Sequence, residues 1–300
     1  MANSLVRSTP RKLGPFEVGP LAYGLWRFTD PSVESGQQRI EAALQQGFNL
    51  IDVADVYGLD WNGTGFGSVE AQLGRVLAAA PDLRSKIVLA TKGGIRPPIP
   101  YDSSAHYLTE AVEASLKRLN TDVIDVYQIH RPDMFTHPAE LAQTLAALRS
   151  AGKIREVGVS NYTPAQVSAL AAHLPFSLVS QQPEFSAAQL APLRDGTLDQ
   201  CMQLSIVPLA WSPLAGGRIP RAEGIAGPLV SALDAIAQRE DVERSTVALA
   251  FVLAHPSAPV AILGTQDLGR IRDARRALDV HLDRNDVYNL IEASEGAPLP

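Results

Sequence analysis

The sequence predicts an α/β fold, a parallel (β/α)8 barrel in a single domain that follows an N-terminal β-hairpin. Eight short apolar runs of strand length alternate with helical segments along the 300 residues. Three of these runs end on a titratable residue, which is typical of a barrel whose active site lies at the carboxyl ends of its strands. The alternative is an open doubly wound sheet, but no G-x-G-x-x-G fingerprint follows the first strand.

The elements are expected in a regular order. Residues 1–10 are predicted to be a disordered leader, and residues 11–300 the barrel domain. A hairpin with Gly14-Pro15 at its turn leads into the first barrel strand, residues 19–23. Glycine after a helix and apolar residues at helical spacing mark the helices. The other strands are expected at 48–52, 87–91, 123–129, 154–159, 178–180, 206–210 and 260–263, and helices at 34–46, 68–80, 107–119, 138–151, 164–172, 196–204, 229–239, 245–254, 267–278 and 286–294.

Composition excludes several classes of protein. The single cysteine, Cys201, cannot form an intramolecular disulfide, which favours a reducing cytoplasm. No signal peptide and no apolar run of about 18 residues is present, so we expect a soluble chain without membrane attachment. The net charge of -6 and the scattered basic residues argue against nucleic acid as the main partner. We expect a monomer or weak oligomer that acts on a small molecule.

The three titratable residues at strand ends are Asp52, Lys92 and His130, and Tyr57 follows in the loop after the second strand. A tyrosine of ordinary pKa near ~10 is a poor acid, but a neighbouring ammonium stabilises its phenolate. A carboxylate would hold the lysine, and an imidazole would orient a carbonyl oxygen. The set supplies an acid without a carbon nucleophile or a metal. It therefore indicates carbonyl reduction, with the hydride brought by a cofactor.

The pattern resembles the aldo-keto reductase family over about residues 12 to 292. The resemblance rests on an Asp with a Tyr five residues later, a third-strand Lys and a fourth-strand His, and on several later runs. His130-Arg-Pro-Asp is similar to a bacterial subgroup. The later runs are Gly158-Val-Ser-Asn-Tyr-Thr-Pro, Gln181-Gln-Pro-Glu, Trp211-Ser-Pro-Leu-Ala-Gly-Gly-Arg and Ile262-Leu-Gly-Thr.

The resemblance implies a role for each matching residue. Tyr57 would be the general acid, Lys92 the group that lowers its pKa, Asp52 the partner of Lys92, and His130 the orienting imidazole. The implied cofactor is NADP(H). Its nicotinamide would be held by Ser160, Asn161 and Gln182 with Trp211 against the ring, its pyrophosphate by the loop that contains Ser212, Leu214, Gly217 and Arg218, and its 2′-phosphate by Gly264, Thr265 and Arg270.

Some residues depart from the family pattern or allow other interpretations. Gly264 stands where well-known members carry a lysine, which leaves Arg270 as the main charge for the 2′-phosphate. Ser160 and Asn161 could instead cap the next helix. Trp26 and Trp61 are candidate walls of the substrate pocket, although loop tryptophans also serve as ordinary packing.

The sequence also allows two other functions. One is an NADP-sensing regulatory subunit of the same fold with slow turnover. The other is an aldolase that forms a Schiff base through Lys92, a scheme in which neither Tyr57 nor the dinucleotide contacts have a role.

Overall fold

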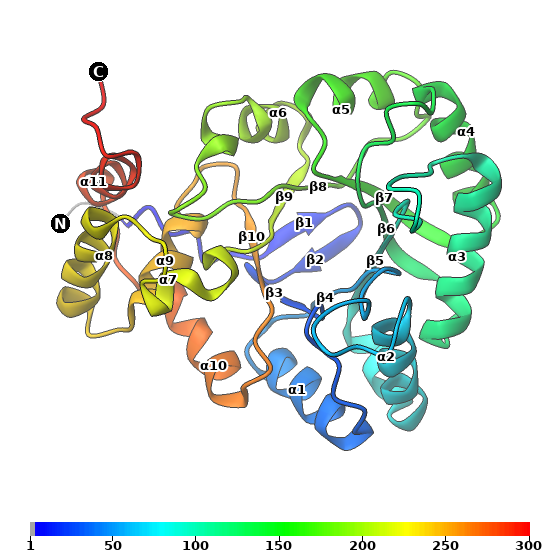
Figure 1. Ribbon diagram of the computed structural model, residues 1–300, viewed down its shortest axis with the longest axis horizontal. Coiled ribbons are helices and arrows are strands. Elements are labelled where there is room, and N and C mark those ends of the chain that lie inside the picture. The colour runs from blue at the N-terminus through cyan, green and yellow to red at the C-terminus, as the bar shows by residue number, and fades with distance from the viewer. Residues whose placement is uncertain (1–3) are drawn as a thin grey trace.

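The computed structural model describes residues 4–300, and eight parallel strands form a closed barrel at its centre (Figure 1). Each strand pairs in register with its neighbours, and the order around the barrel is β10-β3-β4-β5-β6-β7-β8-β9. The barrel prediction is therefore confirmed. The strands are β3 (Leu21–Gly24), β4 (Leu50–Asp52), β5 (Val88–Gly93), β6 (Ile124–Ile129), β7 (Ile154–Ser160), β8 (Ser180–Gln182), β9 (Val207–Ala210) and β10 (Val260–Leu263).

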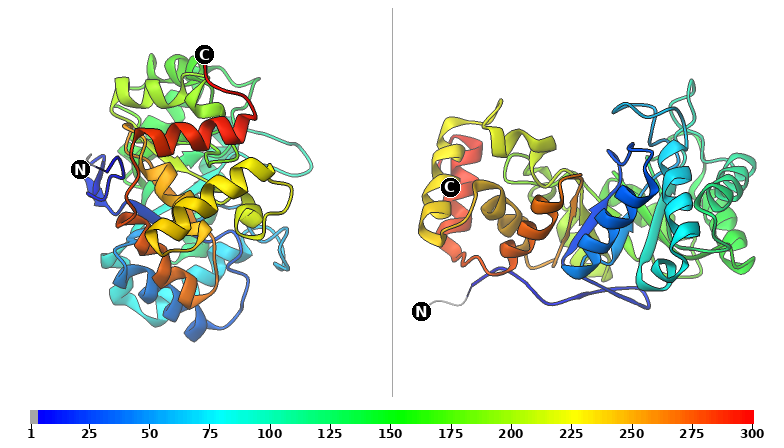
Figure 2. Two further views of the ribbon diagram at one scale, coloured as in Figure 1. Left: turned by 90° about the vertical axis from the view of Figure 1, so that its left-hand side faces the viewer. Right: turned by 90° about the horizontal axis from the view of Figure 1, so that it is seen from below.

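Most of the helices surround the barrel, and the helices Gly227–Glu240 and Arg284–Glu295 lie against each other at one side of it (Figures 1 and 2). Side-chain caps start several of them, as at Ser32 and Ser104, whose hydroxyls accept from backbone N–H groups of the first turn. The α-helices are α1 (Val33–Gln45), α2 (Ser68–Ala79), α3 (Ala105–Leu119), α4 (Pro138–Ser150), α5 (Pro164–Ala171), α6 (Thr197–Leu204), α7 (Arg218–Arg221), α8 (Gly227–Glu240), α9 (Arg244–Leu253), α10 (Leu268–Asp273) and α11 (Arg284–Glu295); the 3-10 helices are η1 (Pro81–Lys86), η2 (Ala191–Leu193), η3 (Ala215–Gly217) and η4 (Ala274–Leu278). None of the helices within residues 4–300 is long and apolar enough to cross a membrane.

The predicted hairpin is present as β1 (Arg11–Leu13) and β2 (Phe16–Val18), and it lies across one end of the barrel (Figure 1). Gly14 takes the left-handed conformation that the turn requires, with φ at +59°. Leu13 and Val18 pack with apolar residues from inside the barrel, such as Leu50 and Val126. The hairpin therefore closes the end of the barrel opposite the carboxyl ends of its strands.

The segment that precedes the hairpin is more ordered than the leader expected from sequence. Residues 1–3 lie outside the described residues. Residues 4–10 form no helix or strand, but Leu5 N–H donates to Leu282 C=O at 2.8 Å and Arg7 N–H to Leu253 C=O at 3.1 Å. Figure 2 shows this segment running beneath the barrel. The apolar side chains of Leu5 and Val6, which pack against the core, account for the difference.

Several elements differ in detail from the prediction, among them β8 and the helix expected at 267–278. β8 covers Ser180–Gln182, two residues later than expected, and within it Gln181 Nε2 donates to the Tyr162 carbonyl at 2.5 Å. The helix expected at 267–278 changes to a 3-10 helix after Asp273. Its buried residues Ile271, Ala274 and Ala277 recur every third position, which is the period of a 3-10 helix.

Candidate active site

The predicted site residues lie together at the carboxyl ends of the barrel strands. Asp52 is the last residue of β4, Lys92 the penultimate residue of β5, and His130 follows β6 directly. The register of the parallel strands brings these residues to similar heights along the barrel axis, since Gly24 is aligned with Asp52 and Lys92 with Gln128. On the other side of the barrel, Ser160 and Gln182 are the last residues of β7 and β8, Trp211 follows β9, and Gly264 follows β10.

Lys92 lies at the centre of the four residues predicted to be catalytic. Its side chain is fully buried, and Nζ donates to Asp52 Oδ2 at 2.7 Å, to the Val53 carbonyl at 3.0 Å and to the Tyr57 hydroxyl at 3.2 Å. Three donors on an ammonium are thus matched by three acceptors. The arrangement joins a carboxylate, an ammonium and a half-buried phenol in a single chain of hydrogen bonds.

The titration of the lysine follows from these contacts. Burial alone would lower the pKa of Lys92, but Asp52 and Tyr57 together raise this pKa above its ordinary value. The side chain therefore stays an ammonium at neutral pH. A Schiff-base lysine needs the opposite shift, toward a free amine, so this geometry does not favour the aldolase alternative.

The tyrosine shows two opposing effects. Burial raises the pKa of Tyr57 above its ordinary value, although Lys92 acts to lower it. Lys92 therefore works in the expected direction and is outweighed by desolvation in this structure. The phenol is protonated at neutral pH, which is the state that an acid needs before it reacts.

His130 stands beside the tyrosine. The two rings meet edge to face with their centroids 5.8 Å apart. Burial, followed by the charges of Lys92 and Arg131, lowers the pKa of His130 well below its ordinary value, so the imidazole is neutral. Its Nδ1 is buried and has no hydrogen-bond partner within the described chain. A neutral imidazole with an unpaired nitrogen can accept or donate a single hydrogen bond to a ligand.

Gln128 is a part of this network that the sequence prediction missed. Its amide nitrogen donates to Asp52 Oδ1 at 3.3 Å, and its oxygen accepts from the Ser180 hydroxyl at 3.2 Å. Gln182 also donates to Asp52 Oδ1, at 2.9 Å. Gln128 lies two residues before His130, and period-two alternation along a strand could have placed both side chains on the same face.

The residues predicted to hold the nicotinamide form a connected group. The Asn161 amide donates to the Ser160 hydroxyl at 2.8 Å, and its oxygen accepts from Trp211 Nε1 at 3.0 Å. Asn161 has a positive φ of 58°, a conformation that asparagine tolerates better than most residues. The capping alternative is wrong, because Thr163 caps α5 in a box with Gln166.

The two predicted phosphate regions are more open. Ser212, Gly216 and Gly217 have positive φ, so the loop after β9 turns sharply and Leu214 is half-buried within it. Arg218 is exposed and donates to the Ala215 carbonyl at 3.1 Å. Gly264 and Thr265 are partly buried after β10, and Arg270 is exposed in the first turn of α10.

The two tryptophans proposed as pocket walls form a pair at the mouth of the barrel. Trp26 and Trp61 meet edge to face at 5.3 Å and are 36% and 46% exposed, more than core packing would leave. Trp26 Nε1 donates to the Asp60 carboxylate at 3.0 Å. Arg27 covers the Trp61 ring at 4.2 Å and donates to the Gly216 carbonyl at 3.2 Å, linking the first and seventh barrel loops.

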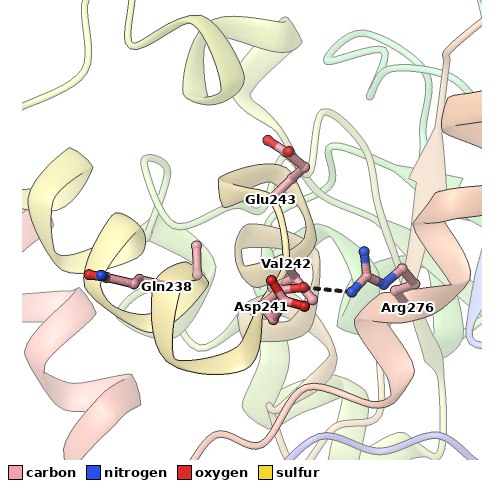
Figure 3. Close-up of a pocket in the computed structure, with 6 residues that line it drawn as sticks. Gln238, Asp241, Val242, Glu243 and Arg276 are labelled. Atoms are coloured by element: carbon pink, nitrogen blue, oxygen red, sulfur yellow. Dashed lines mark hydrogen bonds between the residues drawn. The ribbon is translucent and has the colours of Figure 1, made fainter.

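A surface hollow of about 350 Å³ lies apart from these residues, between the end of α8, the start of α9 and η4 (Figure 3). Asp241, Glu243 and Arg276 are among the residues that line the hollow, and Arg276 Nη2 donates to the Asp241 carbonyl at 2.6 Å (Figure 3). None of the predicted site residues lines this hollow. It is not a candidate for the chemistry described above.

Comparisons with known proteins agree with one another. A family model described as the aldo/keto reductase family matches residues 20–295. The chain is 45% identical over 286 residues to a 6-dehydroglucose reductase of Novosphingobium aromaticivorans, covering 94% of each chain. It is 35% identical to the oxidoreductase YdhF of Escherichia coli, covering 98% of this chain and 99% of that one. The crystal structure of the thermostable aldo-keto reductase Tm1743 has a TM-score of 0.80 at 24% identity, covering 95% of this chain and 99% of that one, and supports the fold.

Proposed function

Because the chain belongs to the aldo/keto reductase family, we propose that it reduces an aldehyde or ketone to an alcohol with NADPH as the cofactor. The observation that carries this proposal is the position of Lys92 Nζ, which bonds both Asp52 Oδ2 and the Tyr57 hydroxyl. The pair of bonds fixes a phenol beside a buried ammonium. Such a phenol can give up its proton to a developing alkoxide.

The residues of the chain donate the proton and stabilise the phenolate that is left behind. When bound, NADPH supplies the hydride. Tyr57 protonates the carbonyl oxygen, Lys92 stabilises the phenolate that remains, and Asp52 keeps Lys92 in place. The neutral His130 ring, with its unpaired Nδ1, is suited to orient the carbonyl oxygen toward the phenol.

The residues around the site fit a dinucleotide. Ser160, Asn161 and Gln182 present amide and hydroxyl groups to a carboxamide, and the Trp211 ring is held in place by Asn161 for stacking. Gly216 and Gly217 allow the backbone to approach a pyrophosphate closely. Arg270, together with Thr265, gives a fork of donors for a 2′-phosphate, which supports NADPH over NADH.

For the substrate, we propose a hydroxylated aldehyde of the 6-dehydroglucose type. The first support is the 45% identity to a reductase of that name. The second is the exposed pair of Trp26 and Trp61 with the Asp60 carboxylate beside it. Aromatic faces flanked by a hydrogen-bonding carboxylate suit a ligand that has both apolar C–H faces and hydroxyl groups.

The experiment follows the loss of NADPH absorbance with purified protein, using 4-nitrobenzaldehyde and 6-dehydroglucose as substrates. Tyr57→Phe should abolish turnover, a drop of about 10²- to 10⁴-fold, while NADPH still quenches the tryptophan fluorescence. A variant that keeps near-normal kcat would contradict the role of Tyr57. Tight NADPH binding with negligible turnover on a panel of aldehydes would instead favour the NADP-sensing regulatory subunit.

A further inference from the structure

Asp55 is a second carboxylate near the catalytic tyrosine, two residues before it in the chain. Its side chain is fully buried, and neither oxygen has a hydrogen-bond partner within residues 4–300. Its backbone N–H donates to the Lys92 carbonyl at 3.0 Å, which ties the turn before Tyr57 to β5. A buried carboxylate without partners is costly to the folded state, so its presence at this position calls for a physical reason.

Tyr127, in the middle of β6, is its counterpart. The ring is fully buried, and its hydroxyl also lacks a partner among the residues that the structure describes. The two groups meet at Gly93, directly after Lys92. A Cβ built on Gly93 would overlap the Tyr127 hydroxyl and lie 3.3 Å from Asp55 Oδ2. The carboxyl and the phenol therefore share the space that a side chain at position 93 would fill.

The charged side chains near Asp55 are bonded to other residues and, over the described range 4–300, form no ion pair with its carboxylate. On α2, the Glu70 carboxylate is buried close by, and on α3 the Arg118 side chain donates to Glu70 at 2.7 Å. Tyr107, also on α3, uses its hydroxyl on the Ile95 carbonyl. On β5, the Lys92 ammonium is bonded to Asp52 and the other acceptors described above.

These surroundings set the protonation state of Asp55. Burial first, and the nearby Glu70 carboxylate second, raise the pKa of Asp55 well above its usual range, against the smaller opposite effects of Arg118, the nearby Val56 backbone N–H and Lys92. A neutral carboxyl has an O–H donor that an ionised one lacks. Burial and Asp55 likewise raise the pKa of Tyr127, so this phenol carries its proton at neutral pH.

We propose that Asp55 and Tyr127 form a hydrogen-bonded pair over Gly93 that positions Tyr57 for the reaction. The terminal torsion of an aspartate is broad, so a small rotation brings the Asp55 carboxyl onto the Tyr127 hydroxyl. The pair holds the turn between β4 and α2 against β5 and β6, and thereby keeps the Tyr57 hydroxyl on Lys92. This role rests on the proposed carbonyl reduction, while the pairing itself does not.

The first test compares three variants. Asp55→Leu and Tyr127→Phe each remove the pair with little change in volume, and each should lower kcat about tenfold with KM and NADPH binding unchanged. The double variant should lose no more than either single one, because both changes remove one interaction. Asp55→Asn keeps a donor and the shape, and should retain kcat within about threefold. Losses that multiply in the double variant would contradict the pair, and unchanged kcat in both single variants would contradict its role in positioning Tyr57.

The second test measures thermal unfolding against pH and needs no activity. The folded-state pKa of Asp55 lies above its ordinary value of 3.8, so this contribution to wild-type stability is complete below that pH and is lost as the pH rises toward the folded-state pKa. Asparagine does not titrate. The Tm of Asp55→Asn should therefore rise relative to that of the wild type as the pH increases above 3.8. A gap that moves in the opposite direction would show that Asp55 is ionised and favourably bound, and the proposal would fail.

The third test uses the space over Gly93. Gly93→Ala places a methyl group against the Tyr127 hydroxyl and should lower Tm, and adding Tyr127→Phe should recover part of that loss. Absence of recovery would mean that the hydroxyl does not occupy this space. If the wild type reduces no aldehyde, the proposed function fails, and the two stability tests still decide whether the pair exists.

Discussion

The two sides of the barrel mouth differ in how much of their hydrogen bonding is complete. On the β4–β6 side, Lys92 and Asp52 are almost fully buried, and every proton of the ammonium has an acceptor. On the side of β9 and β10, Arg218 and Arg270 are exposed. The Arg270 guanidinium bonds to no group within residues 4–300, and Arg218 bonds only to carbonyls of its own loop. The first side is organised before any ligand arrives, whereas the second keeps its charges available for one.

The largest effect should come from breaking the completed side. Lys92→Met should lower kcat about 10³-fold, because the phenolate of Tyr57 loses its ammonium, while NADPH binding changes little. Single-turnover kinetics and fluorescence titration measure the two quantities.

Asp52→Asn tests the other member of the ion pair. It keeps the side-chain shape and leaves Lys92 as a buried cation with only neutral acceptors. Its free energy of unfolding in urea should fall by about 3–5 kcal/mol. If Asp52→Asn unfolds at the wild-type urea concentration, the buried pair does not hold the two strands as the geometry indicates.

An intermediate effect should come from the open side. Arg270→Ala should raise the Kd for NADPH about 10- to 100-fold and leave the Kd for NADH nearly unchanged, because only the 2′-phosphate is affected. Fluorescence quenching gives both constants. Arg272→Ala is the control, since Arg272 is an exposed arginine on the same short helix. Equal losses in the two variants would point to net charge instead of a specific contact.

The smallest effect should come from the junction of the two sides. Trp211→Phe keeps an aromatic face but removes the Nε1 donor to Asn161. A single hydrogen bond of this kind is worth about 1 kcal/mol, so KM for NADPH should rise several-fold with kcat nearly unchanged. Steady-state kinetics provides the check, and a large fall in kcat would show that the ring orientation also governs the chemical step.

The same contrast explains what the sequence could predict. Asp52, Lys92 and His130 sit at ends of apolar runs, and the strand-to-strand pairing of a barrel brings such ends together whatever the loops do. Alternation along the strand could have placed Gln128 on the face of His130, but its bond to Asp52 and the shift of β8 could not be predicted, because they depend on partners across the barrel. Trp26 and Arg27 come from the loop after β3, whereas Asp60 and Trp61 come from the loop after β4, and the contacts between the two loops depend on tertiary structure alone.

The hairpin at the far end of the barrel restricts the direction from which ligands can reach the site. Leu13 and Val18 pack into the apolar cluster inside the strands, so the hairpin covers this end of the barrel in the described part of the chain. We expect substrate and product to reach and leave Tyr57 from the carboxyl ends of the strands, past the loops that carry Trp26, Trp61 and Gly216. Product release must therefore precede entry of the next substrate, because both use the same opening.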